Sequence, residues 1–411
     1  MSQNVLVINQ YYAPDVASSG QLLADLCEGL VSKNHNISVV CAQPSYEIDS
    51  IDVSPRENRD GVEVHRISMW IFRGRSNFMF RVIGYLIFLM QAWFKASSLT
   101  RKESFDVVIT LSNPPFVGIL GAMISRCYGI KYIAVVYDIH PDVVQATRWI
   151  RLPDFVFSIW NNVAKWILRH SSKVVVLGEG MKETLVNTKD VNPENIKVIP
   201  IWARPEFSES FSKTQNEDEL DIRTRFDIGS EELIVLFAGN IGIMQPVDDV
   251  LEAAKKCLEE PVKFIFLGGG VGFEGLDNRI HNLKLHNVLL LRYQPQDVFE
   301  AILKQSDVCV VTLAHGMEKY SVPSRAFTFM SAGKPIIAVM AENSDIGSII
   351  RKNDCGWIFD PGADIGHAIL GCINRNDIVL SKGKNAQDYY HRELSRYEGV
   401  DKFSKLIMEM E

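Results

Sequence analysis

Short apolar runs alternate with amphipathic segments along almost the whole chain. The runs are rich in Val and Ile, and a continuous apolar run of this kind fits a strand buried on both faces of a parallel sheet. Amphipathic segments such as residues 21–32 and 301–305 fit the connecting helices, so the pattern predicts βαβ units and an α/β fold. In the first half of the chain the runs are 5–8, 37–41, 62–65, 107–110, 132–137, 174–177 and 197–199.

The alternation stops at a polar, acidic stretch, residues 208–221, which has the composition of a linker. It then resumes with runs at 233–238, 262–267, 288–291, 308–313, 336–340 and 356–359. A chain of 411 residues exceeds one ordinary hydrophobic core. We therefore predict two doubly wound, parallel-sheet domains facing a cleft, residues 1–203 and 204–387. The helical pattern at 388–411 fits packing on either domain.

Composition narrows the function classes. Apolar residues make up 47% and charged residues 23%, which is typical of a globular protein, and the net charge of −7 gives no support for nucleic acid binding. The seven cysteines form no Cys-x-x-Cys pair and lie mostly in apolar runs, so we expect buried thiols in a reducing compartment. The first residues lead directly into the run 5–8 with no secretion signal, which favours a cytoplasmic protein.

The segment 318–340 predicts a phosphate site. Pro323 suits the entry to a helix, Ser324 can cap it, Gly333 ends it, and a buried strand follows from Ile336. Free backbone N–H groups, the helix dipole and Arg325 would then converge on one point, which favours a doubly charged phosphate group. We therefore expect nucleotide chemistry.

Two other segments of the second half follow strands directly. Gly268-Gly-Gly270 permits the close approach of a ligand, although a plain turn explains it equally well. Asn240 and Gln245 offer neutral donors to a phosphate or belong to an ordinary strand-to-helix loop. Neither a dinucleotide fingerprint nor a P-loop is present.

Strand ends in the first half also carry polar residues. Asp138 and His140 follow the run 132–137, where the active-site groups of a parallel sheet are expected, or they form a structural pair. No third ligand has suitable spacing, so a metal site is unsupported. Glu179 fits a ligand-binding rim or the N-cap of the next helix. Ser19 and Gly20 fit an anionic or sugar group, or only a helix cap.

The segment 78–94 is apolar on nearly all sides from 82 to 90, yet shorter than the ~20 residues that span a bilayer. Basic residues flank it, and Trp70 and Trp93 lie near its ends. This combination fits an interfacial helix on an anionic lipid surface, and a helix buried against the sheet is the alternative. We interpret Trp160 and Trp166 as core residues.

Taken in order, these motifs resemble the family 4 glycosyltransferases, in particular the bacterial surface-polysaccharide branch with the fucosamine transferases of O-antigen clusters. The resemblance covers nearly the whole chain. It is carried by Val198-Ile-Pro200, by Phe237-Ala-Gly-Asn-Ile-Gly242, by the triple glycine, and by Ser321-Val-Pro-Ser-Arg325 through Gly333-Lys-Pro335.

This resemblance implies the GT-B fold, a nucleotide-sugar donor, and retention of anomeric configuration with no cofactor or obligatory metal ion. It also implies a donor on the C-terminal domain, an acceptor on the N-terminal domain, and a final helix 388–411 that packs back on the N-terminal domain. The residues it implies are Ser321, Val322, Ser324 and Arg325 at the diphosphate, Gly268 and Gly269 beside the nucleoside, Arg292 and Tyr293 near the base, and Ser19 and Gly20 at the phosphate or acceptor.

The chain departs from the family at both carboxylates of the Glu-x7-Glu motif, which fall at Tyr320 and Thr328. A threonine in place of a ribose-binding glutamate weakens nucleotide binding roughly tenfold, which an enzyme tolerates.

The family's Arg and Lys after the Phe-Ala-Gly strand are Asn240 and Gln245 here. This loss is more serious, because charge on the leaving group must be stabilised in the transition state. Arg325, the helix amides and neutral donors would then carry that role. The family's His before Asp138 is Tyr137, with His140 close by.

We therefore expect an active hexosyl- or N-acetylhexosaminyl-transferase with Asp138, His140 and Arg325 as catalytic residues. It would move a sugar from a nucleotide diphosphate donor, most simply a UDP-sugar, to a lipid-linked glycan at the inner membrane surface, which it would contact through 78–94. The alternatives are a catalytically silent subunit that supports a partner transferase, and a non-hydrolysing nucleotide-sugar epimerase.

Overall fold

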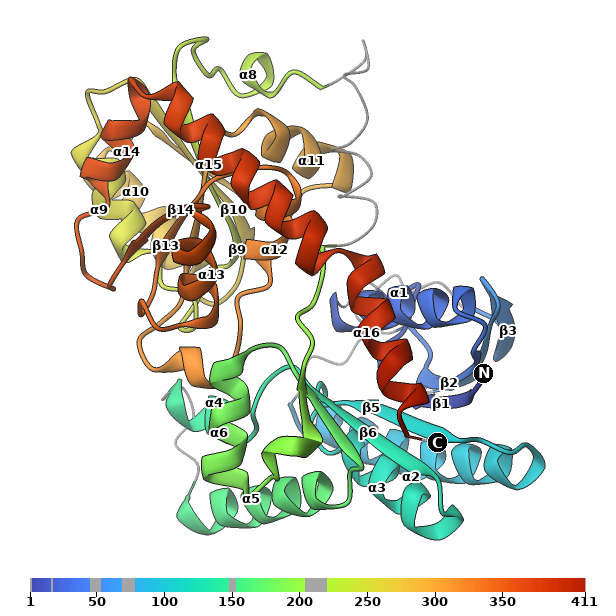
Figure 1. The fold of residues 1–411 in the computed structure, drawn as a ribbon. Helices are drawn as coiled ribbons and strands as arrows, with labels where there is room; N and C mark the ends of the chain where they lie inside the picture. The colour runs from blue at the N-terminus through green and yellow to red at the C-terminus, as the bar shows by residue number, and fades with distance from the viewer. Residues whose placement is uncertain are drawn as a thin grey trace. The chain divides into compact units, whose positions relative to one another are not determined.

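The computed structural model describes residues 2–15, 18–44, 53–68, 78–147, 153–203 and 220–410. The chain divides into two compact units. The first unit comprises residues 1–145, 150–201 and 396–411, and the second comprises 146–149 and 202–395. Each unit is described by itself (Figure 1). Trp70 lies outside the described residues.

The strands of the first unit form one sheet in the order β3-β4-β2-β1-β5-β6-β7-β8. All neighbours are parallel except β3 and β4. The central strands are buried on both faces, as their continuous apolar runs predict. The bounds are β1 Asn4–Ile8, β2 Asn36–Ala42, β3 Arg56–Arg59, β4 Val62–Ile67, β5 Val107–Leu111, β6 Lys131–Val136, β7 Lys173–Val176 and β8 Ile196–Val198.

Helices cover both faces of this sheet. Because crossovers between parallel strands are right-handed, α1, which leads from β1 to β2, lies on the opposite face from α2, α3 and α5, which lead toward β5, β6 and β7. α16 packs against α1, and α3 contacts both α2 and α5 (Figure 1). The bounds are α1 Ser18–Ser32, α2 Phe78–Lys102, α3 Val117–Tyr128, α4 Asp142–Ala146, α5 Asp154–Arg169, α6 Glu179–Lys189, η2 Pro193–Asn195 and α16 Arg396–Met408.

The helix predicted around 78–94 is α2, and it has one buried side and one exposed side. Phe88, Ala92 and Ala96 are fully buried, whereas Leu86 and Phe94 are exposed. None of the helices within the described residues combines the length and apolar character that crossing a bilayer requires.

The second unit is a parallel sheet in the order β11-β10-β9-β12-β13-β14. Its core joins residues of β9, β10 and β12 to the inner faces of α9, α10 and α14. The strands are β9 Leu233–Asn240, β10 Val262–Gly269, β11 Val288–Leu291, β12 Val308–Thr312, β13 Ile336–Val339 and β14 Gly356–Phe359. The helices are α8 Ile222–Arg225, α9 Asp248–Lys256, α10 Phe273–Leu283, α11 Gln296–Gln305, η3 Met317–Lys319, α12 Arg325–Ser331, α13 Asp345–Asn353, α14 Gly366–Ile373, α15 Asn376–Tyr389 and the π-helical turn η4 Tyr390–Leu394.

Strand order reverses once in each sheet, and the point of reversal is where a ligand-binding site is expected. In the first unit the chain moves outward in opposite directions from the β1–β5 pair, and in the second unit from the β9–β12 pair. Loops at the carboxyl ends of such a pair separate and leave a crevice that binds ligands. Both sheets therefore expose a place for polar chemistry at their carboxyl edges.

The predicted continuous helix 388–411 is divided at Ser395, whose backbone is extended. Tyr390 belongs to the second unit, where its hydroxyl accepts a hydrogen bond from the Ala203 backbone N–H at 3.2 Å. α16 belongs to the first unit, where Arg396 donates to the Asp25 carbonyl at 2.9 Å and Lys33 pairs with Asp401 at 2.8 Å. The domain boundaries 203/204 and 387/388 stay predictions.

Packing of α16 on α1 can be tested at Gly29. A Cβ at this position would lie 2.4 Å from a methyl group of Val400, which is buried. We expect Gly29→Ala to lower the free energy of unfolding of the first unit by about 1–3 kcal/mol, because overpacking strains a close-packed contact. Hydrogen exchange of the α1 and α16 amides measures the change. Val400→Ala should restore part of the loss, and strictly additive effects in the double variant would contradict the packing.

Candidate functional site

Polar side chains meet at the carboxyl ends of β5 and β6 in the first unit. The Ser112 hydroxyl accepts hydrogen bonds from the backbone N–H groups of Tyr137 at 2.9 Å and Asp138 at 3.3 Å, which ties the two strand ends together. Asn113 Nδ2 donates to Asp138 Oδ2 at 2.8 Å, and Asn113 Oδ1 lies 3.2 Å from His140 Nε2. Asn113 thus joins the two predicted catalytic residues of this unit.

The bridging amide fixes the protonation pattern of His140. Since Nδ2 of Asn113 faces the Asp138 carboxylate, its Oδ1 faces His140 and only accepts. His140 therefore carries its proton on Nε2, and its Nδ1 is buried with no hydrogen-bond partner among the described residues. Burial lowers the pKa of His140, against the opposing effects of Asp138 and Asp142. A neutral imidazole results at pH 7.

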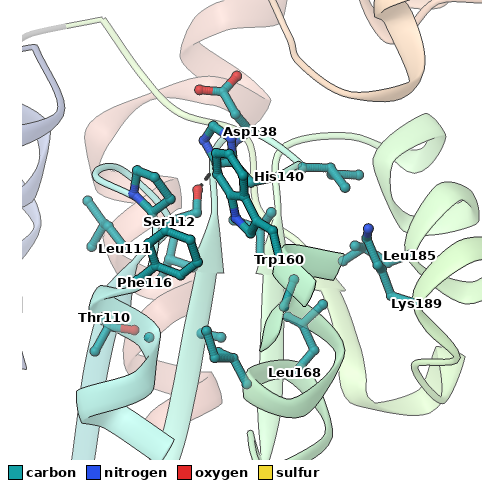
Figure 2. A pocket seen from close by; sticks show the side chains of 18 of the residues that line it. Thr110, Leu111, Ser112, Phe116, Asp138, His140, Trp160, Leu168, Leu185 and Lys189 are labelled. Carbon is teal, nitrogen blue, oxygen red and sulfur yellow. Dashed lines mark hydrogen bonds between the residues drawn. The ribbon is translucent and has the colours of Figure 1, made fainter. Parts of the chain in front are cut away.

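Aromatic rings support the other side of His140. Its imidazole stacks on Trp160 with ring centroids 5.7 Å apart and planes at 13°, and Phe116 packs on Trp160 at 5.1 Å. Below them is a cavity of about 70 Å³ lined mainly by apolar side chains. Figure 2 shows the Asp138 carboxylate pointing away from these side chains. Asp138 is thus the polar group that this arrangement presents.

A buried lysine fixes the segment that follows His140. The Lys189 ammonium, 1% exposed, binds the carboxylate of Asp142 and the amide oxygen of Asn161. These three residues come from α6, α4 and α5. Burial lowers the pKa of Lys189, while its bond to Asp142 raises it. The interaction connects all three helices beside the cavity.

The other residues predicted in the first unit lie at the same edge of the sheet. Ser19 and Gly20 are in the first turn of α1, which follows β1, and Gly20 is packed against the backbone of Tyr11 and Tyr12. Glu179 is the first residue of α6 after β7, and Gly178 occupies the N-cap position. The predicted N-cap role of Glu179 is therefore wrong, because the helix begins one residue earlier than that role requires.

In the second unit the loops after β9 and β12 meet at the strand-order reversal. The Ala314 backbone N–H donates to the Met244 carbonyl at 2.9 Å. A Cβ on Gly268, whose φ is +158°, would lie 1.9 Å from the Gly239 carbonyl oxygen, and one on Gly270, φ +122°, would lie 2.0 Å from Asn240 Oδ1. These glycines are required by the close approach of the β9 and β10 ends. Gln245 Oε1 lies 2.5 Å from the Cβ position of Gly239.

Arg292 and Tyr293 follow β11 at the same edge. Arg292 Nη2 lies 2.5 Å from Glu274 Oε1, and its guanidinium lies 4.3 Å from the centroid of the Phe273 ring. Tyr293 is exposed, and its ring lies beside Gly269. The structure thus brings Gly269 and Tyr293 together, while Arg292 is paired with a carboxylate.

The predicted phosphate segment 318–340 forms η3, α12 and β13. Ser324 has helical angles, φ −61° and ψ −25°, and its side chain makes no capping hydrogen bond, so the predicted cap is wrong. Ser324 itself is exposed, whereas Val322 and Thr328 are buried. Val322 can therefore contact a ligand only through its backbone.

Arg325 begins α12, and its guanidinium lies 5.1 Å from the centroid of the Phe299 ring. Tyr320 ends the 3-10 turn Met317–Lys319, and Ser321 directly follows it. The residues expected at a diphosphate thus share one short segment after β12. Within the described residues, no group of His, Cys, Asp and Glu side chains has the arrangement of a metal site.

Asn113 is the functional candidate that sequence reasoning missed. The available signal was the motif Ser112-Asn-Pro-Pro115, directly after the run 107–110 and in the same position relative to its strand as Asp138. In general, polar residues at the end of a buried parallel strand indicate a ligand-binding or active site.

Comparison with known families gives two matches that follow one another along the chain. The family described as "Glycosyl transferase 4-like domain" matches residues 19–202, and the family described as "Glycosyl transferases group 1" matches residues 218–387. The first match lies in the unit with Asp138 and His140, and the second in the unit with Arg325.

Individual proteins give the same result. The chain is 25% identical over 321 residues to the glycosyltransferase WbjE of Pseudomonas aeruginosa, covering 78% of each chain. It is 21% identical over 355 residues to WcaI of Escherichia coli strain K12, a glycosyltransferase named for colanic acid biosynthesis, covering 84% of this chain and 85% of WcaI. The structure of Anabaena HepE in complex with UDP and glucose is similar with a TM-score of 0.72 and 15% identity, covering 99% of this chain and 100% of HepE.

The role of Asn113 can be tested by Asn113→Asp. A second carboxylate beside His140 Nε2 favours the charged imidazolium, so we expect the pKa of His140 to rise. NMR titration of ring-labelled histidine measures the protonated fraction at pH 6, which should be larger in the variant, with His170 as internal reference. An unchanged titration of His140 would show that Asn113 does not govern it.

Proposed function

The chain is a family 4 glycosyltransferase with the GT-B fold, and we propose that it transfers a sugar from a nucleotide diphosphate donor, most simply a UDP-sugar, to a lipid-linked glycan. We propose further that the reaction retains the anomeric configuration and serves the synthesis of a bacterial surface polysaccharide. The relatives WbjE and WcaI support the class of pathway, and HepE, whose structure holds UDP, supports the donor.

One observation carries the donor side of the proposal. The loops after β9 and β12 meet at the strand-order reversal of the second unit, and the segment Ser321–Arg325 follows that meeting point along the chain, after the 3-10 turn Met317–Lys319. This is where an open α/β sheet binds ligands. Backbone N–H groups there would hold the two phosphates, with the Arg325 guanidinium as a charge-assisted partner. Gly269 and the Tyr293 ring would receive the nucleoside, and Ser19 and Gly20 would contact the phosphate or acceptor.

The replaced family residues define what Arg325 must do. Asn240 and Gln245 have neutral side chains whose oxygen atoms lie against the backbone of Gly270 and Gly239. Tyr320 and Thr328 provide hydroxyl groups where the family has carboxylates. Charge that develops on the departing diphosphate would then be stabilised by Arg325 and by backbone N–H groups.

On the first unit, Asp138 would accept a hydrogen bond from the acceptor hydroxyl. Its carboxylate is oriented by Asn113 and points away from the apolar cavity (Figure 2). The His140 Nε2–H, by contrast, faces Asn113. His140 would therefore act by fixing Asn113, and its neutral imidazole adds no competing charge. The reaction needs no metal ion in this proposal.

A lipid-linked acceptor requires the enzyme to work at the membrane. We propose that the protein is cytoplasmic and binds the inner face of the plasma membrane through α2. The outward side of that helix carries exposed Leu86, Met90 and Phe94, while its inward side is buried in the first unit.

A catalytically silent subunit is the competing function, favoured by the missing carboxylates and cations. It would keep the fold and bind a partner transferase without turnover of its own. Activity of the isolated chain excludes it.

The proposal predicts that Arg325→Ala lowers kcat by about 10²–10³-fold in a transfer assay with a panel of UDP-sugars, because a charge-stabilising donor is lost. Lys352→Ala, at an exposed basic residue of α13, is the matched control and should leave kcat unchanged. Absence of both binding and turnover over the whole panel would reject the donor assignment. Equal activity of Arg325→Ala and wild type would remove Arg325 from the site.

A further inference from the structure

α5 carries large apolar side chains on its outward face as well as on its inward face. Phe155 is 68% exposed, Ile159 62% and Trp166 36%. Their spacing of four and seven residues places them on one side of the helix. Inward, Trp160, Ile167 and Leu168 line the cavity of the first unit. The prediction that Trp166 is a core residue is therefore wrong: its ring contacts His170, with centroids 4.6 Å apart, but it lies on the outward side of α5 with Phe155 and Ile159.

α2 carries a similar outward row. Ile83, Leu86, Met90 and Phe94 are between 41% and 65% exposed and recur at intervals of three and four residues. The inward side with Phe88, Ala92 and Ala96 already attaches the helix to the sheet. Scattered single apolar residues are normal on a protein surface, but two aligned rows of them indicate an interaction surface.

Both rows belong to the same layer of the first unit. α3 contacts α2 on one side and α5 on the other, and all three helices cover one face of the sheet (Figure 1). Since their inward sides pack on that sheet, their outward sides face the same direction. The two apolar rows thus flank α3 on a single surface, which we name the α2/α5 surface.

The charge of this layer is opposite to that of the whole chain. Asp154 is the one Asp or Glu in the sequences of α2, α3 and α5. The same helices carry Lys95, Arg101, Lys102, Arg126, Lys165 and Arg169. Asp190 at the end of α6 pairs with Lys165 at 2.8 Å and with Arg169 at 3.4 Å, which neutralises part of this charge. The layer remains basic in a chain of net charge −7.

We propose that the α2/α5 surface docks on an anionic phospholipid bilayer, with the outward rows of both helices entering the headgroup region. Exposed Trp, Phe and Leu side chains surrounded by Lys and Arg match such a surface, since apolar burial and attraction to anionic lipid act together. The inference deepens the proposed function, on whose membrane step it rests. It assigns to α5 a role equal to that of α2.

The test is co-sedimentation of the full chain with vesicles of phosphatidylcholine alone or mixed with phosphatidylglycerol. Wild type should bind the mixed vesicles, and binding should fall with added salt. Phe155→Ser with Ile159→Ser on α5, and Leu86→Ser with Met90→Ser on α2, should each weaken binding at least about tenfold. Leu380→Ser is the matched control, since Leu380 is 65% exposed on α15 of the second unit. It should bind like wild type.

Three outcomes would overturn the proposal. In the first two, wild type fails to bind the mixed vesicles, or the α5 variants bind them like wild type. In the third, light scattering shows that wild type is a dimer and that the α5 variants are monomers. The substituted residues are exposed, and circular dichroism verifies that the variants are folded. Turnover of a short-chain, water-soluble acceptor is measured in parallel. Turnover without α5-dependent vesicle binding rejects only the docking surface, whereas α5-dependent binding without turnover rejects only the proposed function.

Discussion

The rest of the structure depends on the burial of both faces of each parallel sheet. Backbone groups in these strands are paired along the ladders, and the side chains on both faces are covered by helices. Polar chemistry is therefore excluded from the sheet faces and confined to the strand ends. Asn113, Asp138 and His140 lie at such ends in the first unit. In the second unit, Gly268 lies near the end of β10, and Ser321 and Arg325 lie after β12.

The same constraint explains why hydrogen bonding at the first site is so specific. Burial of His140 against Trp160 disfavours an imidazolium and leaves a single hydrogen-bond connection, through Asn113, to Asp138. An amide is suited to this connection because it donates at one end and accepts at the other. A carboxylate in place of Asn113 would add a second negative charge beside Asp138. An alkyl side chain there would leave Asp138 and His140 without this hydrogen-bond partner.

Much of the fold could be predicted from the sequence, because strands buried on both faces leave an unbroken apolar run. β1, β5, β6, β9, β10 and β12 coincide with such runs to within two residues. Helix termini were less predictable: Ser324 occupies the N-cap position of α12 but makes no capping hydrogen bond, and α6 begins at Glu179 itself, so that residue does not cap it. Asn113 was missed because its meaning lies in a contact with residues 25 and 27 positions away.

The outward row of α5 was missed for a related reason. Phe155, Ile159 and Trp166 have the composition of a core, and only the position of the helix shows that they lie outside it. α5 also links the two halves of the proposed function, because its Trp160 lies against His140 while Phe155 and Ile159, less than two turns away, face outward. A glycan whose lipid remains in the bilayer would then reach Asp138 along the N-terminal half of α5. If the lipid-linked acceptor and the docking hold as proposed, this path from α5 to the carboxylate would favour acceptors whose sugars lie near the lipid, since a long glycan would carry its terminal hydroxyl beyond this site.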